Sequence, residues 1–195
     1  WKLLDDLTVN YGLRFDAYKG FASENQLSPR VNAVWTPLDG TTVHAGYARY
    51  FSPPPFELVG AETVEKFACA ATGPEPRCNT ASPADTTNDV SKAERANYFD
   101  LGVEQKMGDD LTMGIDAYDK RSHNLIDEGQ FGAPIILTPF NYKYGKNYGV
   151  ELSANYSKGP FSAYGNIALE HAEGKDITSS QFQFDPGDLA YIEDH

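Results

Sequence analysis

The stretch Leu7–Tyr18, LTVNYGLRFDAY, decides the fold of this chain. Every second residue from Leu7 to Ala17 is apolar or aromatic, and the residues between them are largely polar. Successive side chains of a β-strand point to opposite faces, so this alternation predicts a strand with one apolar and one largely polar face. The fold then depends on whether the apolar face meets a protein core or lipid.

The same alternation recurs in six later segments, which gives seven expected strands. These segments are residues 30–35, 41–51, 97–106, 111–118, 147–156 and 161–170. Strands in soluble sheets usually have ~5–6 residues, whereas ~9–11 residues cross a bilayer at a tilt. Most of the seven segments are close to the longer value. The sequence therefore predicts an all-β protein whose strands are long enough to span a membrane.

The connections between these strands alternate strictly between short and long. The short ones are TPLDGT (36–41), KMGDD (106–110) and SKGP (157–160), and their Pro, Gly and Asp residues are typical of turns. The long ones are residues 19–27, 52–92, 125–139 and the segment from 173 onward. In an up-and-down antiparallel order, all short turns then lie at one end. Outer-membrane β-barrels have this arrangement, with short periplasmic turns and long extracellular loops.

Aromatic residues on the apolar faces lie near the strand ends, with aliphatic residues between them. Amphipathic rings settle at the headgroup level of a membrane, so two aromatic girdles predict a lipid-facing wall. Tyr11, in the middle of its strand, does not fit this pattern. The predicted girdle residues are Phe15, Trp35, Tyr47, Phe99, Tyr148, Tyr156 and Phe161.

The opposite faces carry many charged side chains, which a dry core would accommodate only at a cost of several kcal/mol each. A water-filled lumen removes this cost. A soluble sheet with one face in solvent removes it equally well, so periodicity leaves both readings open. The predicted lumen-facing residues are Arg14, His44, Asp100, Glu104, Asp116, Glu151 and Glu170.

The overall charge and the termini narrow the class of protein further. The net charge of −12 gives no basic footprint for nucleic acid, so we expect no nucleic-acid partner. No run of about 18 apolar residues predicts a transmembrane helix. The chain starts at Trp1 without a recognisable signal peptide, and we expect the numbering to begin inside a longer precursor.

The longest connection carries the clearest candidates for ligand contact. Cys69 and Cys78 close a short loop without a nearby His or further Cys, which favours a disulfide over two unpaired thiols. Phe51, Phe56 and Phe67 belong to the same region. Loops on a rigid scaffold often carry function, so these aromatic residues either contact a ligand or pack within the loop.

No pattern in the sequence predicts catalysis, a metal site or a cofactor. The four histidines, at positions 44, 123, 171 and 195, are scattered, whereas metal ligands usually form tighter sets. No nucleophile elbow or phosphate-binding loop is present in the sequence. The carboxylates are numerous, but none is singled out for acid–base work. We therefore expect a protein that is not an enzyme.

Three segments together resemble the barrel of TonB-dependent outer-membrane receptors. Residues 27–55 contain a Trp-x-Pro turn at Trp35 followed by the strand motif YARY. Residues 92–129 and 141–174 resemble the next two hairpins, the second with its Gly-x-Glu-Leu motif at Gly149. The resemblance extends from about Leu7 to Ala172, and the order and spacing of the motifs carry it.

The resemblance implies active uptake of a scarce nutrient, such as siderophore-bound iron, cobalamin, a glycan or a peptide. It implies four partners: outer-membrane lipid, the protein's own plug domain, the TonB complex of the inner membrane and the nutrient. Barrels of the family have about 22 strands, and seven cannot close such a cylinder. We therefore expect residues 1–195 to form one partial barrel domain from the C-terminal side, without plug and remaining strands. A soluble all-β ligand-binding module and a passive porin stay as alternatives.

Overall fold

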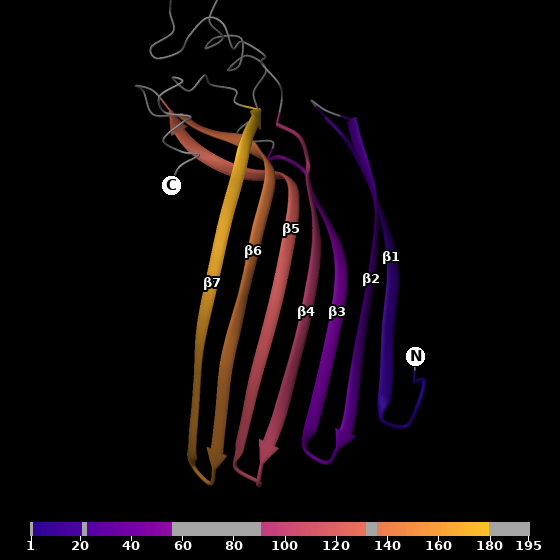
Figure 1. Ribbon diagram of the computed structural model, residues 1–195, viewed down its shortest axis with the longest axis vertical. Coiled ribbons are helices and arrows are strands. Elements are labelled where there is room, and N and C mark those ends of the chain that lie inside the picture. Colours follow the sequence, from indigo (N-terminus) through magenta and orange to yellow (C-terminus); the bar gives the residue numbers. More distant parts are fainter. Residues whose placement is uncertain (1, 21–22, 56–90, 132–135, 180–195) are drawn as a thin grey trace, which may run out of the picture.

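The computed structural model describes residues 2–20, 23–55, 91–131 and 136–179 (Figure 1). Each secondary-structure element in these ranges is a β-strand. Within the same ranges, no helix has the length and hydropathy needed to cross a membrane.

Seven strands form a single antiparallel sheet in which each strand pairs with its neighbours in sequence. The all-β, up-and-down prediction is therefore confirmed. The strands are β1 (Leu7–Lys19), β2 (Ser23–Leu38), β3 (Thr41–Ser52), β4 (Glu94–Met107), β5 (Leu111–Phe131), β6 (Ile136–Lys158) and β7 (Phe161–Ser179).

The three predicted short turns lie together at one end of the sheet, shown at the bottom of Figure 1. Each contains a glycine with positive φ: Gly40 at 77°, Gly108 at 66° and Gly159 at 56°. Tight hairpin turns between twisted strands require this backbone conformation, which glycine adopts without a steric penalty. The strand ends at which the other connections start lie at the opposite end, here called the loop end.

Three of the four predicted long connections have wrong bounds, because they include several residues of strands. The segment from residue 173 onward begins with residues 173–179 of β7. Residues 23–27 belong to β2, which pairs with β1 up to the Lys19–Ser23 rung. Residues 125–131 and 136–139 belong to the β5–β6 hairpin, whose ladder continues to Phe131 and Ile136. Their Ser, Asn, Asp and Gly content suggested loops, but cross-strand pairing overrides that local preference. The strands are consequently longer than the predicted ten residues.

The β5–β6 hairpin contains one irregularity that shifts its alternation. Asn124 has a φ of 54° and is skipped by the register between the His123–Tyr144 and Leu125–Tyr142 rungs. Beyond it, the Leu125 side chain lies over Gly145, within 3.0 Å of where a Cβ would be. Lys143 opposite it is skipped as well, so the strand register is unchanged, while the Leu125 side chain lies on the same face as Gly145.

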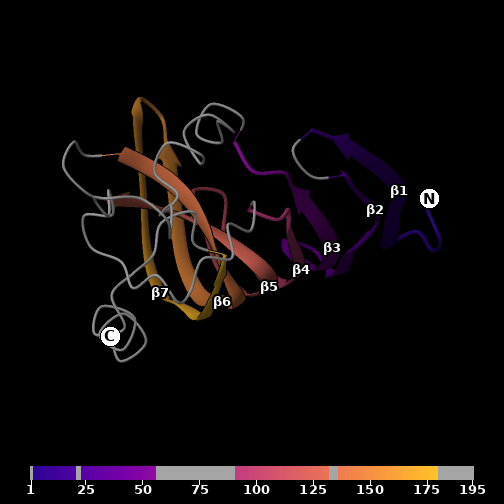
Figure 2. The same ribbon diagram turned by 90° about the horizontal axis from the view of Figure 1, so that it is seen from above.

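The sheet is one curved layer with little apolar core (Figure 2). The buried hydrophobic residues of the described ranges are Ala93, Ala96 and Phe140, all close to the loop end. Large apolar residues in mid-strand are exposed, for example Leu152 at 52% and Ile115 at 48%. A soluble sandwich would cover these residues with a second layer. The described residues provide none, and β1 and β7 remain the edges of an open wall.

Candidate functional site

The strand register divides the side chains between two faces. We call one the polar face; on it, Gly46 pairs with Asp100, Asp100 with Tyr118, and Gly149 with Glu170. All seven residues predicted to face the lumen lie on this face. All seven predicted girdle residues lie on the opposite, apolar face. What the two faces contact in a complete barrel stays a prediction.

A cluster around His44 lies in the middle of the polar face. The His44 Nε2 atom is 3.0 Å from Asp116 Oδ1 and 3.7 Å from Asp100 Oδ2. Two glycines make room for these groups. A Cβ on Gly102 would overlap the His44 ring and the Asp116 carboxylate, and a Cβ on Gly46 would overlap the Asp100 carboxylate. Three of the predicted residues are thus brought together.

The other predicted lumen-facing residues lie apart from this cluster. Arg14 on β1 forms an ion pair of 2.6 Å with Asp16. Glu151 pairs across the ladder with Asp116 and accepts a hydrogen bond of 2.9 Å from Asn166. Glu170 accepts a hydrogen bond from Asn147 at 3.0 Å, and Glu104 pairs with Thr42 and Gly114. These groups form a polar, mostly acidic wall.

Three tyrosines form an aromatic ladder on the polar face towards the loop end. The ring centroids of Tyr50 and Tyr98 are 6.1 Å apart in an edge-on arrangement, and those of Tyr98 and Tyr118 are 6.1 Å apart in a stacked one. Beside the ladder lies a hollow of about 290 Å³ that Tyr50, Tyr98, Glu94 and Lys120 help to line. Flat rings with hydroxyl groups can bind both apolar and polar parts of a ligand.

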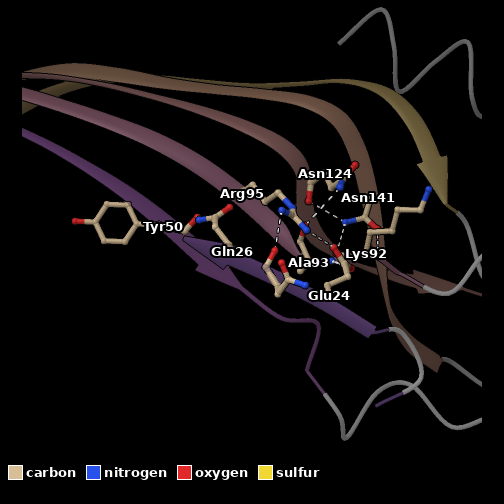
Figure 3. A network of polar contacts seen from close by, with 9 residues as sticks. Glu24, Gln26, Tyr50, Lys92, Ala93, Arg95, Asn124 and Asn141 are labelled. Atoms are coloured by element: carbon tan, nitrogen blue, oxygen red, sulfur yellow. Dashed lines mark hydrogen bonds and ion pairs between the residues drawn. The ribbon is translucent and has the colours of Figure 1, made fainter. Parts of the chain in front are cut away.

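A network of buried polar contacts fixes the chain where it returns from the β3–β4 connection (Figure 3). The Asn141 side chain is fully buried. Its Oδ1 accepts a hydrogen bond from the Lys92 amide at 2.8 Å, and its Nδ2 donates to the carbonyl oxygens of Lys92 at 3.1 Å and Asn124 at 2.8 Å. One amide thus joins the start of β4 to the β5–β6 hairpin.

The same network reaches β2 through Glu24. The Glu24 carboxylate accepts a hydrogen bond from the Ala93 amide at 2.7 Å and pairs with Arg95 at 2.9 Å. Glu94 follows Ala93 in the chain, and its carboxylate accepts hydrogen bonds from Ser122 at 2.9 Å and Lys120 at 2.8 Å. Residues 92–95, which we call the return segment, are therefore held by contacts with β2 and with β5.

The Tyr142 side chain lies closer to the loop end than the aromatic ladder, on strand β6 of the β5–β6 hairpin. Burial raises the pKa of its phenol above the usual value, and the nearby Asp127 carboxylate raises it further. The phenol therefore stays protonated near neutral pH and can act as a hydrogen-bond donor at the loop end.

The aromatic residues of the apolar face orient their polar atoms towards the two ends of the sheet. The Trp35 indole donates a hydrogen bond to Asp6 Oδ2 at 3.0 Å near the turns. At the other end, the Tyr47 hydroxyl contacts Asn97 Oδ1 at 2.9 Å, and its ring packs on Phe99 with centroids 5.0 Å apart. Rings at a membrane interface have this orientation because one end is apolar and the other is hydrated.

Of the residues predicted to form a disulfide or to contact a ligand in the longest connection, only Phe51 is among the described residues. Cys69, Cys78, Phe56 and Phe67 lie outside the described residues. Phe51 is part of β3, on the apolar face, with the Arg95 guanidinium 5.6 Å from its ring centre. Its contact with a ligand stays a prediction.

The sequence reasoning missed the tyrosine ladder and the loop-end network. Tyr50, Tyr98 and Tyr118 share the polar-face alternation, so a search of that face for aromatic residues would have found them. Glu24, Lys92 and Asn141 are far apart in sequence, and no local pattern connects them. Among the described side chains, no group of three or more His, Cys, Asp or Glu residues is arranged to hold a metal ion.

Comparisons with known proteins agree with this architecture. The chain matches the family described as "TonB dependent receptor-like, beta-barrel" over residues 1–193. None of the curated proteins compared matches it.

Three solved structures illustrate the structural likeness. The FrpB iron transporter from Neisseria meningitidis (F3-3 variant) is 19% identical, with 95% of this chain and 26% of that chain covered and a TM-score of 0.63. The copper transporter OprC is 17% identical, with 89% and 27% covered and a TM-score of 0.63. The alcaligin outer-membrane receptor FauA from Bordetella pertussis is 15% identical, with 92% and 30% covered and a TM-score of 0.50.

This chain spans between 26% and 30% of the length of these three proteins, and at such identities the likeness shows the fold. The family match covers nearly the whole sequence and excludes the alternative of a soluble binding module. The chain therefore belongs to the TonB dependent receptor-like β-barrel family, whose barrels lie in the outer membrane.

Proposed function

We propose that the receptor to which this wall belongs takes up a scarce nutrient across the outer membrane, using energy that the TonB complex delivers to a plug domain. The observation that carries this proposal is that the single-layer sheet has one apolar face and one polar face. Its apolar face has aliphatic residues between two aromatic girdles, and its polar face has charged groups that would be costly in a dry core. Family membership supports active transport over catalysis.

In this proposal, each feature of the site has a separate role. The apolar face contacts outer-membrane lipid. The acidic wall around His44, Asp100 and Asp116 faces the plug domain and the lumen. The tyrosine ladder lies near the loop end, with Tyr50 two residues before the end of β3, where an incoming nutrient would first meet the barrel. The Glu24–Asn141 network holds the return of that connection in a fixed position.

The β3–β4 connection itself would contact the nutrient through Phe56 and Phe67, stabilised by a disulfide between Cys69 and Cys78. A disulfide shortens the accessible range of an unfolded loop, which reduces the entropy lost on ligand binding. Mass spectrometry after alkylation without reductant tests the bond, since two alkylated thiols would contradict it.

The deciding experiment uses the full-length gene in a strain that lacks its own copy. Uptake of radiolabelled ferric siderophores, cobalamin, oligosaccharides and peptides is measured with and without the TonB complex. We expect one class to be accumulated only when the complex is present, with surface binding retained when it is absent. Uptake that continues without the complex would identify a passive porin and overturn the proposal.

A further inference from the structure

Two basic residues face each other directly across the ladder on the apolar face. Arg121 on β5 pairs with Lys146 on β6. This pair is two residues closer to the loop end than the Asp119–Tyr148 pair. We call them the basic pair. Like charges at directly opposite positions of antiparallel strands are destabilising. An anion bound between the two side chains would remove this repulsion.

Nearby acidic groups compensate only part of this charge. Arg121 Nε is 2.8 Å from Asp119 Oδ1, but the Arg121 side chain remains 70% exposed. Lys146 forms no ion pair with any other residue that the structure describes, and its Nζ lies 4.4 Å from the Tyr148 ring centre. Glu173, which is opposite Lys146 on β7, contacts His171 at 3.5 Å instead. A third cation, the exposed Lys175, lies two residues further along β7 towards the loop end, opposite Tyr144.

The height of the basic pair on the wall indicates what the anion is. Aromatic rings of the girdle mark the headgroup level of the membrane. Lys146 is two positions from Tyr148 along β6, so the basic pair lies about 7 Å further along the strand. Lipid phosphates occupy this level, just outside the aromatic rings. The basic pair lies at the loop end, which in this family faces the cell exterior.

We propose that Arg121 and Lys146 bind a phosphate group of an outer-leaflet lipid, with Lys175 as an additional contact. The guanidinium of Arg121 and the ammonium of Lys146 both donate hydrogen bonds to phosphate oxygens, and the phosphate removes their mutual repulsion. The Tyr148 ring positions the Lys146 ammonium towards the interface. This inference rests on the placement of the apolar face in lipid but not on nutrient transport.

The test measures lipid binding to the purified full-length receptor in a neutral detergent. The probes are lipid A with two phosphates, its dephosphorylated form, and inorganic phosphate. Native mass spectrometry is expected to show bound lipid A in preference to the dephosphorylated form. Basic residues near an anionic surface each contribute roughly fivefold in binding, so Arg121→Gln together with Lys146→Gln should weaken it by more than tenfold.

Two further variants separate lipid binding from a structural role. Lys146→Gln alone removes the like charge opposite Arg121 without placing an acid opposite Glu173, so it should preserve or raise thermal stability and still weaken lipid binding. Arg30→Gln is the matched control, since Arg30 pairs with Ala48 at nearly the same height but on the polar face, and it should bind normally. Equal binding by the Arg121→Gln, Lys146→Gln variant and the wild type would overturn the proposal. Binding of inorganic phosphate as tight as that of lipid A would also overturn it.

Discussion

At the scale of single residues, Leu152 is the most direct probe of what the apolar face contacts. It lies midway between Tyr148 and Tyr156, which are about 27 Å apart along the strand at ~3.4 Å per residue. With a tilt of ~40°, this separation spans about 21 Å along the membrane normal, which fits within the ~25 Å height of the apolar band of an outer-membrane barrel. We predict that Leu152→Arg lowers the stability of the full-length receptor by about 2–4 kcal/mol. Equilibrium unfolding in lipid vesicles measures this loss.

The neighbouring residue supplies the control for this prediction. Ser153 lies at almost the same depth but on the polar face, opposite Gly114. Ser153→Arg should therefore cost much less than Leu152→Arg. Equal effects of the two substitutions would show that the two faces do not differ in their surroundings.

A second residue-scale prediction concerns the space in front of His44. Gly102 lies opposite both His44 and Asp116, and a Cβ at this position would overlap them. Gly102→Val should displace the His44–Asp116 contact and lower the free energy of unfolding by about 1–3 kcal/mol. Gly12→Val on the same polar face is the matched control, because a Cβ there would be 3.4 Å or more from the Arg30 side chain, an ordinary contact. A thermal melt of the full-length receptor compares them, and a Gly102→Val variant as stable as the control would contradict the prediction.

At the scale of elements, the polar network decides how the start of β4 is held. Asn141 makes three hydrogen bonds that bring together segments that are not adjacent in the sheet order. Asn141→Ala would leave the Lys92 amide and the Lys92 and Asn124 carbonyl groups without these partners, at a cost of about 1–3 kcal/mol in local stability. We predict faster hydrogen exchange at the Lys92 and Ala93 amides, which mass spectrometry can measure.

An exposed amide serves as the comparison for Asn141. Asn166 donates one hydrogen bond to Glu151 on the polar face and is exposed to solvent. Asn166→Ala should leave exchange at Lys92 and Ala93 unchanged. If Asn141→Ala also leaves it unchanged, the network does not hold the return segment.

At the scale of the whole molecule, the sheet lacks what a soluble domain needs. Its described residues bury only two alanines and one phenylalanine as apolar core, and both edge strands are open. We predict that residues 1–195 produced alone stay in solution only with detergent, because exposed apolar faces and open edges associate in water. Sedimentation in the presence and absence of detergent tests this. A compact, detergent-free monomer would contradict a membrane wall.

The sequence alone was sufficient for the pattern of strands and for the division of residues between faces. Leu7–Tyr18 and the later alternating segments specify it, because a period of two is a local property of the chain. Gly40, Gly108 and Gly159 also specify the short turns locally, since each hairpin needs a positive φ. Residues 125–131 and 136–139 could not be predicted in this way. Their polar composition resembles a loop, and only pairing of β5 with β6 keeps them extended.

The sequence by itself determined that this protein is an up-and-down β-sheet with one apolar and one polar face. The tertiary structure decided where distant residues meet: His44 with Asp100 and Asp116, Glu24 with Ala93, and Arg121 with Lys146. The physical reason is that alternation depends on neighbouring residues, whereas these contacts depend on the register between strands. The register in turn depends on cross-strand packing and hydrogen bonds, which no single segment contains.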